Sequence, residues 1–185
     1  MDRNSVRMVV AGAILGWIGV GAYGIWQIAD QESGEGWEWP YLIFTVALIL
    51  ATALTLVAGW MASCDTARPM LRRCGIGVGA LALASALTVA WALPLWMTLI
   101  AASLAIFAVA APRDLRPTLG VVVAAQIAGM AVMYVAVIAE VGRQDSYGDY
   151  PAAFGVGLVV TAVVSALGLA TFARAGSTIR TLATP

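Results

Sequence analysis

The longest uncharged stretch of the chain constrains its fold more than any other feature. Residues 75–111 number 37 and carry no charged side chain. As one helix they would rise about 1.5 Å each and reach roughly 55 Å, whereas the hydrocarbon core of a bilayer is about 30 Å thick. The sequence therefore predicts a hairpin that turns near Leu93 and Pro94, with membrane spans at 75–92 and 94–111.

Four further apolar runs are long enough to cross a membrane, which takes about 20 residues. Hydrophobic residues make up 62% of the chain and charged residues 11%, a balance that a soluble domain cannot bury. We therefore expect an all-α polytopic membrane protein with six transmembrane helices arranged as three hairpins, in a single membrane domain over residues 1–185. The four further spans are predicted at 8–28, 40–62, 119–139 and 151–173.

Charge placement predicts the orientation, because positively charged residues are retained on the cytoplasmic side of a membrane. If both termini are cytoplasmic, nine arginines and three aspartates fall on the inner side, with a net charge of +6. The outer loops then carry Arg143 against seven carboxylates, with a net charge of −6. Five spans would instead move Arg113 and Arg116 outside. We therefore predict cytoplasmic N- and C-termini and a multi-pass location in a bacterial-type plasma (inner) membrane.

Missing residue types exclude several classes of enzyme. The chain has no histidine and no lysine, which excludes histidine-ligated metals, haem held by two histidines, serine–histidine catalysis and Schiff-base chemistry. No carboxylate lies deep in a predicted span, and the nearest, Glu140, is at the outer end of the fifth. We expect no catalytic residues, no cofactor and no enzyme activity, and no nucleic-acid partner.

Two cysteines, Cys64 and Cys74, flank the predicted cytoplasmic loop between the second and third spans. A disulfide is not expected in that reducing compartment. With Met61 and Met70 nearby, the thiols would supply the soft ligands that Cu(I) prefers, which makes metal sensing a third hypothesis. Because the cysteines are ten positions apart without a CxxC pair, we favour ordinary loop-edge cysteines and predict no metal site.

The first span carries a stripe of glycines at helical spacing, Gly12, Gly16 and Gly19. In lipid, helices associate through close backbone approach, which small residues permit. The first interpretation is a packing surface inside the bundle. In the second interpretation the stripe contacts another subunit, because a bundle of this size has more helix faces than its own contacts require.

Four polar residues at membrane depth are candidates for a polar path or for contacts between helices: Gln126, Tyr134, Thr88 and Ser165. Gln126 is the most notable, because a side-chain amide in lipid needs a hydrogen-bond partner. Tyr134 follows it two turns later along the same span. The functional interpretation is a path or pocket for a small solute. We favour the other interpretation, in which Gln126 bonds across to a neighbouring helix.

The predicted outer loop before the second span combines acidic and aromatic residues, Glu35, Trp37, Glu38 and Trp39. Aromatic rings prefer the head-group layer, so a belt that also includes Trp96 explains the tryptophans without a further function. A docking patch for a partner protein would use the same residue types.

Two main functional hypotheses follow. The first is a non-enzymatic accessory or interaction subunit that pairs with another membrane protein, or with a second copy of itself, through the glycine stripe and the acidic outer loops. The alternative is a small-solute permease or channel, or the substrate-binding subunit of a transporter, with Gln126 and Tyr134 in the path. Besides such a partner, we expect the chain to contact the lipid bilayer.

Overall fold

The computed structural model describes residues 3–29, 38–64, 68–88, 93–141 and 151–181, and all regular secondary structure in these ranges is helical. The predicted all-α fold is confirmed, and the predicted number of helices is found in this part of the chain. The six helices are α1 (Arg3–Ala29), α2 (Glu38–Ala62), α3 (Pro69–Thr88), α4 (Leu93–Ala110), α5 (Arg116–Val141) and α6 (Pro151–Thr181).

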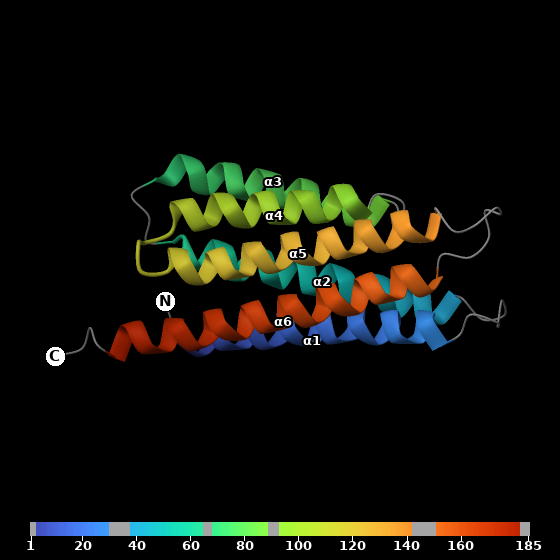
Figure 1. Ribbon diagram of the computed structural model, residues 1–185. Coiled ribbons are helices and arrows are strands. Elements are labelled where there is room, and N and C mark those ends of the chain that lie inside the picture. The colour runs from blue at the N-terminus through green and yellow to red at the C-terminus, as the bar shows by residue number, and fades with distance from the viewer. Residues whose placement is uncertain (1–2, 30–37, 65–67, 89–92, 142–150, 182–185) are drawn as a thin grey trace.

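Successive helices run in opposite directions, so the bundle consists of three antiparallel hairpins, as Figure 1 shows. The first helix, α1, packs against both α2 and α6, and α6 also packs against α5. Helix α4 lies between α3 and α5, while α2 makes smaller contacts with α3 and α4. As a result, α3 lies at one edge of the bundle and the first and last helices lie side by side.

Helix boundaries differ in detail from the predicted spans, because helical backbone continues past the apolar residues. Helix α3 begins at Pro69, six residues before its predicted span, and therefore carries Arg72 and Arg73 near its start. Leu93 and Pro94 belong to the first turn of α4, which begins one residue before its predicted span at 94–111. Proline is well accommodated there, since the first turn needs no intrahelical N–H.

Three helices in the described part of the chain are long and apolar enough to cross a membrane. Their candidate spans are Ser5–Ala29 in α1, Leu42–Ala62 in α2 and Gly155–Arg174 in α6. Shorter apolar segments lie in α4, at Trp96–Ala110, and in α5, at Arg116–Val132. These lengths indicate a membrane protein. That all six helices cross, and which way the termini face, stay predictions.

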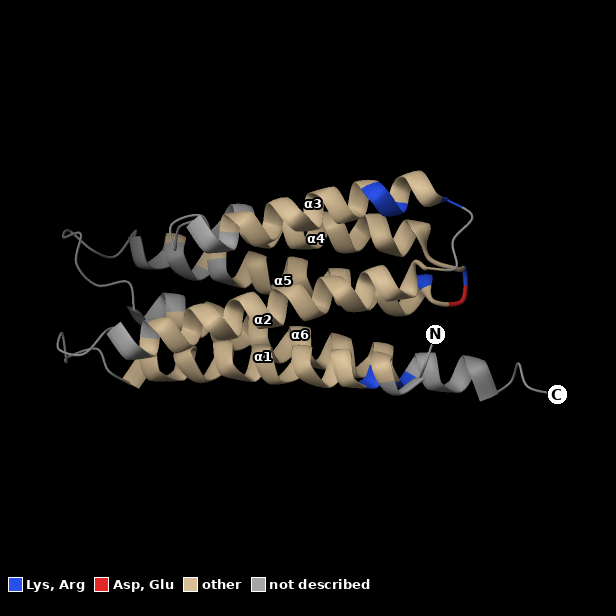
Figure 2. Ribbon diagram, turned by 180° about the vertical axis from the view of Figure 1, so that it is seen from behind, with Lys and Arg blue, Asp and Glu red and all other residues tan. Residues whose placement is uncertain are grey.

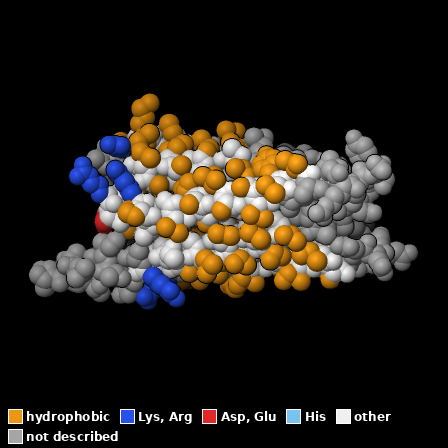
Figure 3. Space-filling view, viewed as in Figure 1, with side chains coloured by type: hydrophobic (Ala, Val, Ile, Leu, Met, Phe, Trp, Pro, Cys, Tyr) orange, Lys and Arg blue, Asp and Glu red, His pale blue; other side chains and the backbone are white. Residues whose placement is uncertain are grey.

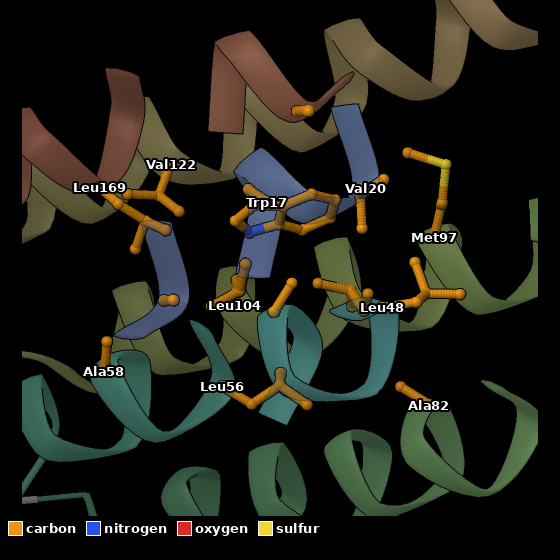
Figure 4. Close-up of a cluster of buried hydrophobic side chains, with 14 of the residues drawn as sticks. Trp17, Val20, Leu48, Leu56, Ala58, Ala82, Met97, Leu104, Val122 and Leu169 are labelled. Carbon is orange, nitrogen blue, oxygen red and sulfur yellow. The ribbon is translucent and has the colours of Figure 1, made fainter. Parts of the chain in front are cut away.

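All six helices contribute to one buried cluster, with the fully buried Trp17 of α1 near its centre (Figure 4). The surrounding side chains are apolar and come from helices far apart in the sequence. Those labelled in Figure 4 include Leu48 of α2, Ala82 of α3, Met97 and Leu104 of α4, Val122 of α5 and Leu169 of α6.

Trp96 belongs to this core and not to an interfacial belt, so its assignment to the belt was wrong. Its side chain is only 2% exposed, and the centroid of its ring lies 6.4 Å from that of Trp17. The start of α4 therefore turns its large aromatic side chain towards α1 and away from the surface.

Charged and apolar side chains are separated on the surface. The described arginines lie towards one end of the bundle, where the blue segments of the ribbon are found together with a red one (Figure 2). Exposed apolar side chains cover the sides between the two ends, including Leu15 and Val135, which are each 67% exposed (Figure 3). A broad apolar surface beside a basic end is typical of a protein embedded in lipid. These arginines are Arg7, Arg68, Arg72, Arg73, Arg113, Arg116 and Arg174.

Candidate functional site

The predicted glycine stripe of α1 packs against α2. A Cβ atom added at Gly16 would lie 2.7 Å from the backbone nitrogen of Ala51, and one added at Gly19 would lie 2.9 Å from the Cβ of Ala47. At Gly12 the added atom would meet a side chain of α2 at 2.8 Å. A larger residue at Gly16 would meet the α2 backbone and push the two helices apart, whereas at Gly12 the side chain of Leu54 could move aside. Because the stripe is covered within the chain, a partner subunit would have to bind another surface.

A second set of glycines on α1 faces α6, and the sequence analysis missed it. A Cβ atom added at Gly24 would lie 2.7 Å from the carbonyl oxygen of Gly155, and one added at Gly21 would lie 3.1 Å from the Cβ of Ala162. Gly21 and Gly24 are three positions apart, a spacing that could have marked a second packing surface. Helix α1 is therefore packed closely on two sides.

Buried side-chain hydrogen bonds join the two helices in each of the first two hairpins. In the α1–α2 hairpin the indole Nε1 of Trp17 donates to the Oγ1 of Thr55 at 3.0 Å. In the α3–α4 hairpin the hydroxyl of Ser103 donates to the carbonyl oxygen of Gly75 at 2.8 Å. Polar groups used in this way hold helices together in an environment that gives no hydrophobic drive for their association.

The α5–α6 hairpin contains the third such bond, made by two of the four residues predicted for a path or a helix contact. Nε2 of Gln126 donates to the Oγ of Ser165 at 2.7 Å, and both side chains are fully buried. The structure does not bring Tyr134 to them, because its side chain is 42% exposed on α5. Thr88 is the last residue of α3, and its side chain lies outside the described part of the structure.

Three buried polar atoms in the described part of the chain have no hydrogen-bond partner: Thr52 Oγ1, Trp96 Nε1 and Gln126 Oε1. Leaving such an atom unpaired costs about 1–3 kcal/mol. The Gln126 oxygen bears most directly on function, because the other half of the same amide is already bonded to Ser165. The Gln126 Oε1 is therefore a buried acceptor on α5 that has no hydrogen-bond partner within the described ranges.

The predicted outer docking patch is described only in part. Glu35 and Trp37 lie outside the described residues. Glu38 and Trp39 are the first two residues of α2, and their side chains are not described. The docking prediction for this patch therefore stays a prediction.

The two cysteines lie near the basic end and form no disulfide. Cys64 is partly exposed, and its thiol lies 3.6 Å from the carbonyl oxygen of Trp60, whereas Cys74 is exposed on α3. Among the residues that the structure describes, no three or more histidine, cysteine, aspartate or glutamate side chains are grouped so that they could hold a metal ion.

Two arginines at the basic end have defined contacts. The guanidinium of Arg72 lies over the ring of Trp60, with its central carbon 5.4 Å from the ring centroid. Nε of Arg116 donates to the carbonyl oxygen of Ala111 at 3.0 Å, after the end of α4. Arg73 and Arg113 are exposed. The basic end therefore combines positioned guanidinium groups with exposed ones.

Comparison of the chain with family models, with curated proteins and with solved structures found no match.

Proposed function

We propose that the chain is a non-enzymatic protein of the plasma membrane, with six spans and both termini in the cytoplasm, that acts as an accessory or interaction subunit of a membrane complex. The proposal rests on one observation, which is that buried polar side chains bond neighbouring helices to each other. In each hairpin, a buried side-chain hydrogen bond joins one helix to the other. Polar side chains that already bond one helix to another are not available to line a path for a solute.

The partner surface of this proposal lies on the outside of the bundle, because α2 and α6 cover the glycines of α1. Two other glycines offer exposed positions on different helices, Gly77 on α3 and Gly120 on α5. A Cβ atom added at either would meet nothing within 4 Å. A bulky residue at these positions would obstruct a partner helix while leaving the bundle intact. By contrast, Gly16→Leu would disturb the bundle itself, so any loss of a complex could not be assigned to the partner.

The experiment is purification from native membrane in a mild detergent, followed by mass spectrometry of co-eluting proteins and measurement of the particle mass. The expected result is a stoichiometric partner, or a second copy of the chain, that is lost in Gly77→Leu or in Gly120→Leu. Whichever of these two variants retains the partner is the matched control for the other. A parent protein that elutes alone as a monomer would contradict the proposal.

The alternative function, a small-solute permease or channel or the substrate-binding subunit of a transporter, is favoured by one observation. The Gln126 Oε1 is buried and has no partner among the described residues, so it could accept a hydrogen bond from a polar solute. The transport function predicts that Gln126→Leu abolishes uptake of a small solute into reconstituted vesicles, while expression of the protein is unchanged. The accessory function predicts that the same variant behaves as the parent.

A further inference from the structure

The corner between α2 and α3 presents a positively charged group in a fixed position. Arg72 is held over the face of Trp60 at 5.4 Å, so the end of α2 orients a side chain from the start of α3. A cation over an indole ring is stabilised by the negative face of the ring. Arg73, the next residue, is exposed. Two arginines therefore occupy adjacent positions near the start of α3, one fixed on Trp60 and one exposed.

An apolar face of α3 continues directly from Arg73. Ile76 is 46% exposed and Leu81 is 61% exposed, and the open glycine Gly77 lies between them. Gly77 and Leu81 follow Arg73 in steps of four residues, so they lie along one side of the helix with it. Ile76 borders that row three positions after Arg73. A charged group at the end of an exposed apolar stripe matches a molecule with an anionic head and a hydrocarbon tail.

Guanidinium groups suit phosphate esters in particular. Their planar donor fork can bond two phosphate oxygens at once, whereas an ammonium group acts as a point charge. The chain contains ten arginines and no lysine. The chemistry of this corner is therefore suited to a phosphodiester.

We propose that Arg72 and Arg73 bind the head group of an anionic phospholipid whose acyl chains lie along the exposed face of α3. The inference rests on the membrane location proposed above, but not on any partner protein. Trp60 acts as a positioning residue that holds Arg72 towards the head group. The occupant is a lipid of the surrounding leaflet, because the apolar face of α3 gives a free phosphate nothing to contact.

The test uses the full chain in nanodiscs of phosphatidylcholine with a minor fraction of phosphatidylglycerol, with native mass spectrometry to measure the retained phosphatidylglycerol. A hydrogen bond to a charged group is worth roughly ten-fold or more in an equilibrium constant, so Arg72→Gln with Arg73→Gln should weaken retention by at least about ten-fold beyond the diffuse effect of lost charge. The matched control is Arg7→Gln with Arg113→Gln, which removes the same charge from exposed positions at the same end. This control should retain phosphatidylglycerol nearly as the parent does.

Several results would overturn the proposal. Equal weakening in the two double variants would show that the basic end attracts lipid only diffusely. Displacement of phosphatidylglycerol by inorganic phosphate, at ionic strength matched with chloride, would identify a site for a soluble anion. Retention in Trp60→Leu equal to that of the parent would remove the positioning role.

A charge-conserving variant keeps the test decisive if the glutamine variant does not fold. Arg72→Lys with Arg73→Lys keeps the charge but loses the bidentate fork, and it should retain less phosphatidylglycerol than the parent. Unchanged retention would refute specific recognition of the phosphodiester. Lipid retention is measured without a partner protein, so failure of this proposal and failure of the accessory function are separate results.

Discussion

The glycine contact between α1 and α2 predicts a specific loss of stability in Gly16→Ala. The new methyl carbon would lie 2.7 Å from the backbone nitrogen of Ala51, 2.8 Å from its Cα and 2.9 Å from its Cβ. Two of these three atoms belong to the backbone of α2, so no rotation of a side chain can relieve the contact. The helices must instead move apart, which weakens the close packing between them.

The magnitude follows from a comparison with Gly77→Ala on α3, where an added Cβ atom meets nothing within 4 Å. Each substitution gains about 1 kcal/mol from the better helix propensity of alanine. Forcing an extra methyl into a packed interior costs about 1–3 kcal/mol. Because the propensity gain cancels in the difference, Gly16→Ala should be less stable than Gly77→Ala by about 1–3 kcal/mol.

Unfolding in mixed micelles of increasing dodecyl sulfate content measures this difference, with tryptophan fluorescence as the signal. The fully buried Trp17 lies one residue after the substitution and reports on the α1–α2 contact. Circular dichroism of both variants before titration checks that the helices form. Equal unfolding free energies for Gly16→Ala and Gly77→Ala would refute the reasoning, because they would mean that α1 and α2 do not approach as closely as the structure shows.

Two further predictions use the buried hydrogen bonds and the same titration. Ser165→Ala should destabilise the bundle by about 1–3 kcal/mol, because it leaves both ends of the buried Gln126 amide unpaired, whereas the double variant Gln126→Leu with Ser165→Ala removes both partners and should be nearly neutral. The reverse order of stabilities would contradict this. Trp17→Phe should cost about 0.5–1.5 kcal/mol more than Trp96→Phe, since both rings are buried but only the Trp17 nitrogen has a partner. A larger loss in Trp96→Phe would show that its nitrogen is bonded after all.

The helical hairpins could be predicted from the sequence because hydropathy, helix length and charge constrain them independently. The uncharged stretch over residues 75–111 is too long for one span, and the structure divides it between α3 and α4. The helix ends could not be placed as well. Hydropathy marks the apolar residues of a helix and not its ends, so α3 begins at Pro69, six residues before its predicted span.

The partners of individual side chains were harder to predict, for a physical reason. In a soluble protein the apolar side of a helix identifies the buried side, but here the lipid-facing and the bundle-facing sides are both apolar. The sequence therefore identified Gly16 as a packing residue without identifying α2 as its neighbour. For the same reason Trp96 was assigned to the interface, although it packs on Trp17 in the core.

The arrangement of glycines on α1 explains how the first and last helices come to close the bundle. Gly16 lets α2 approach on one side, and Gly24 lets α6 approach on the other through Gly155. The first of these contacts lies within a hairpin and is local in sequence, whereas the second joins segments separated by most of the chain. Helices in lipid form before they associate, and their association depends on packing. The α1–α6 contact can therefore form only after α6 has formed, and the glycines on that side of α1 make the closed bundle depend on α6.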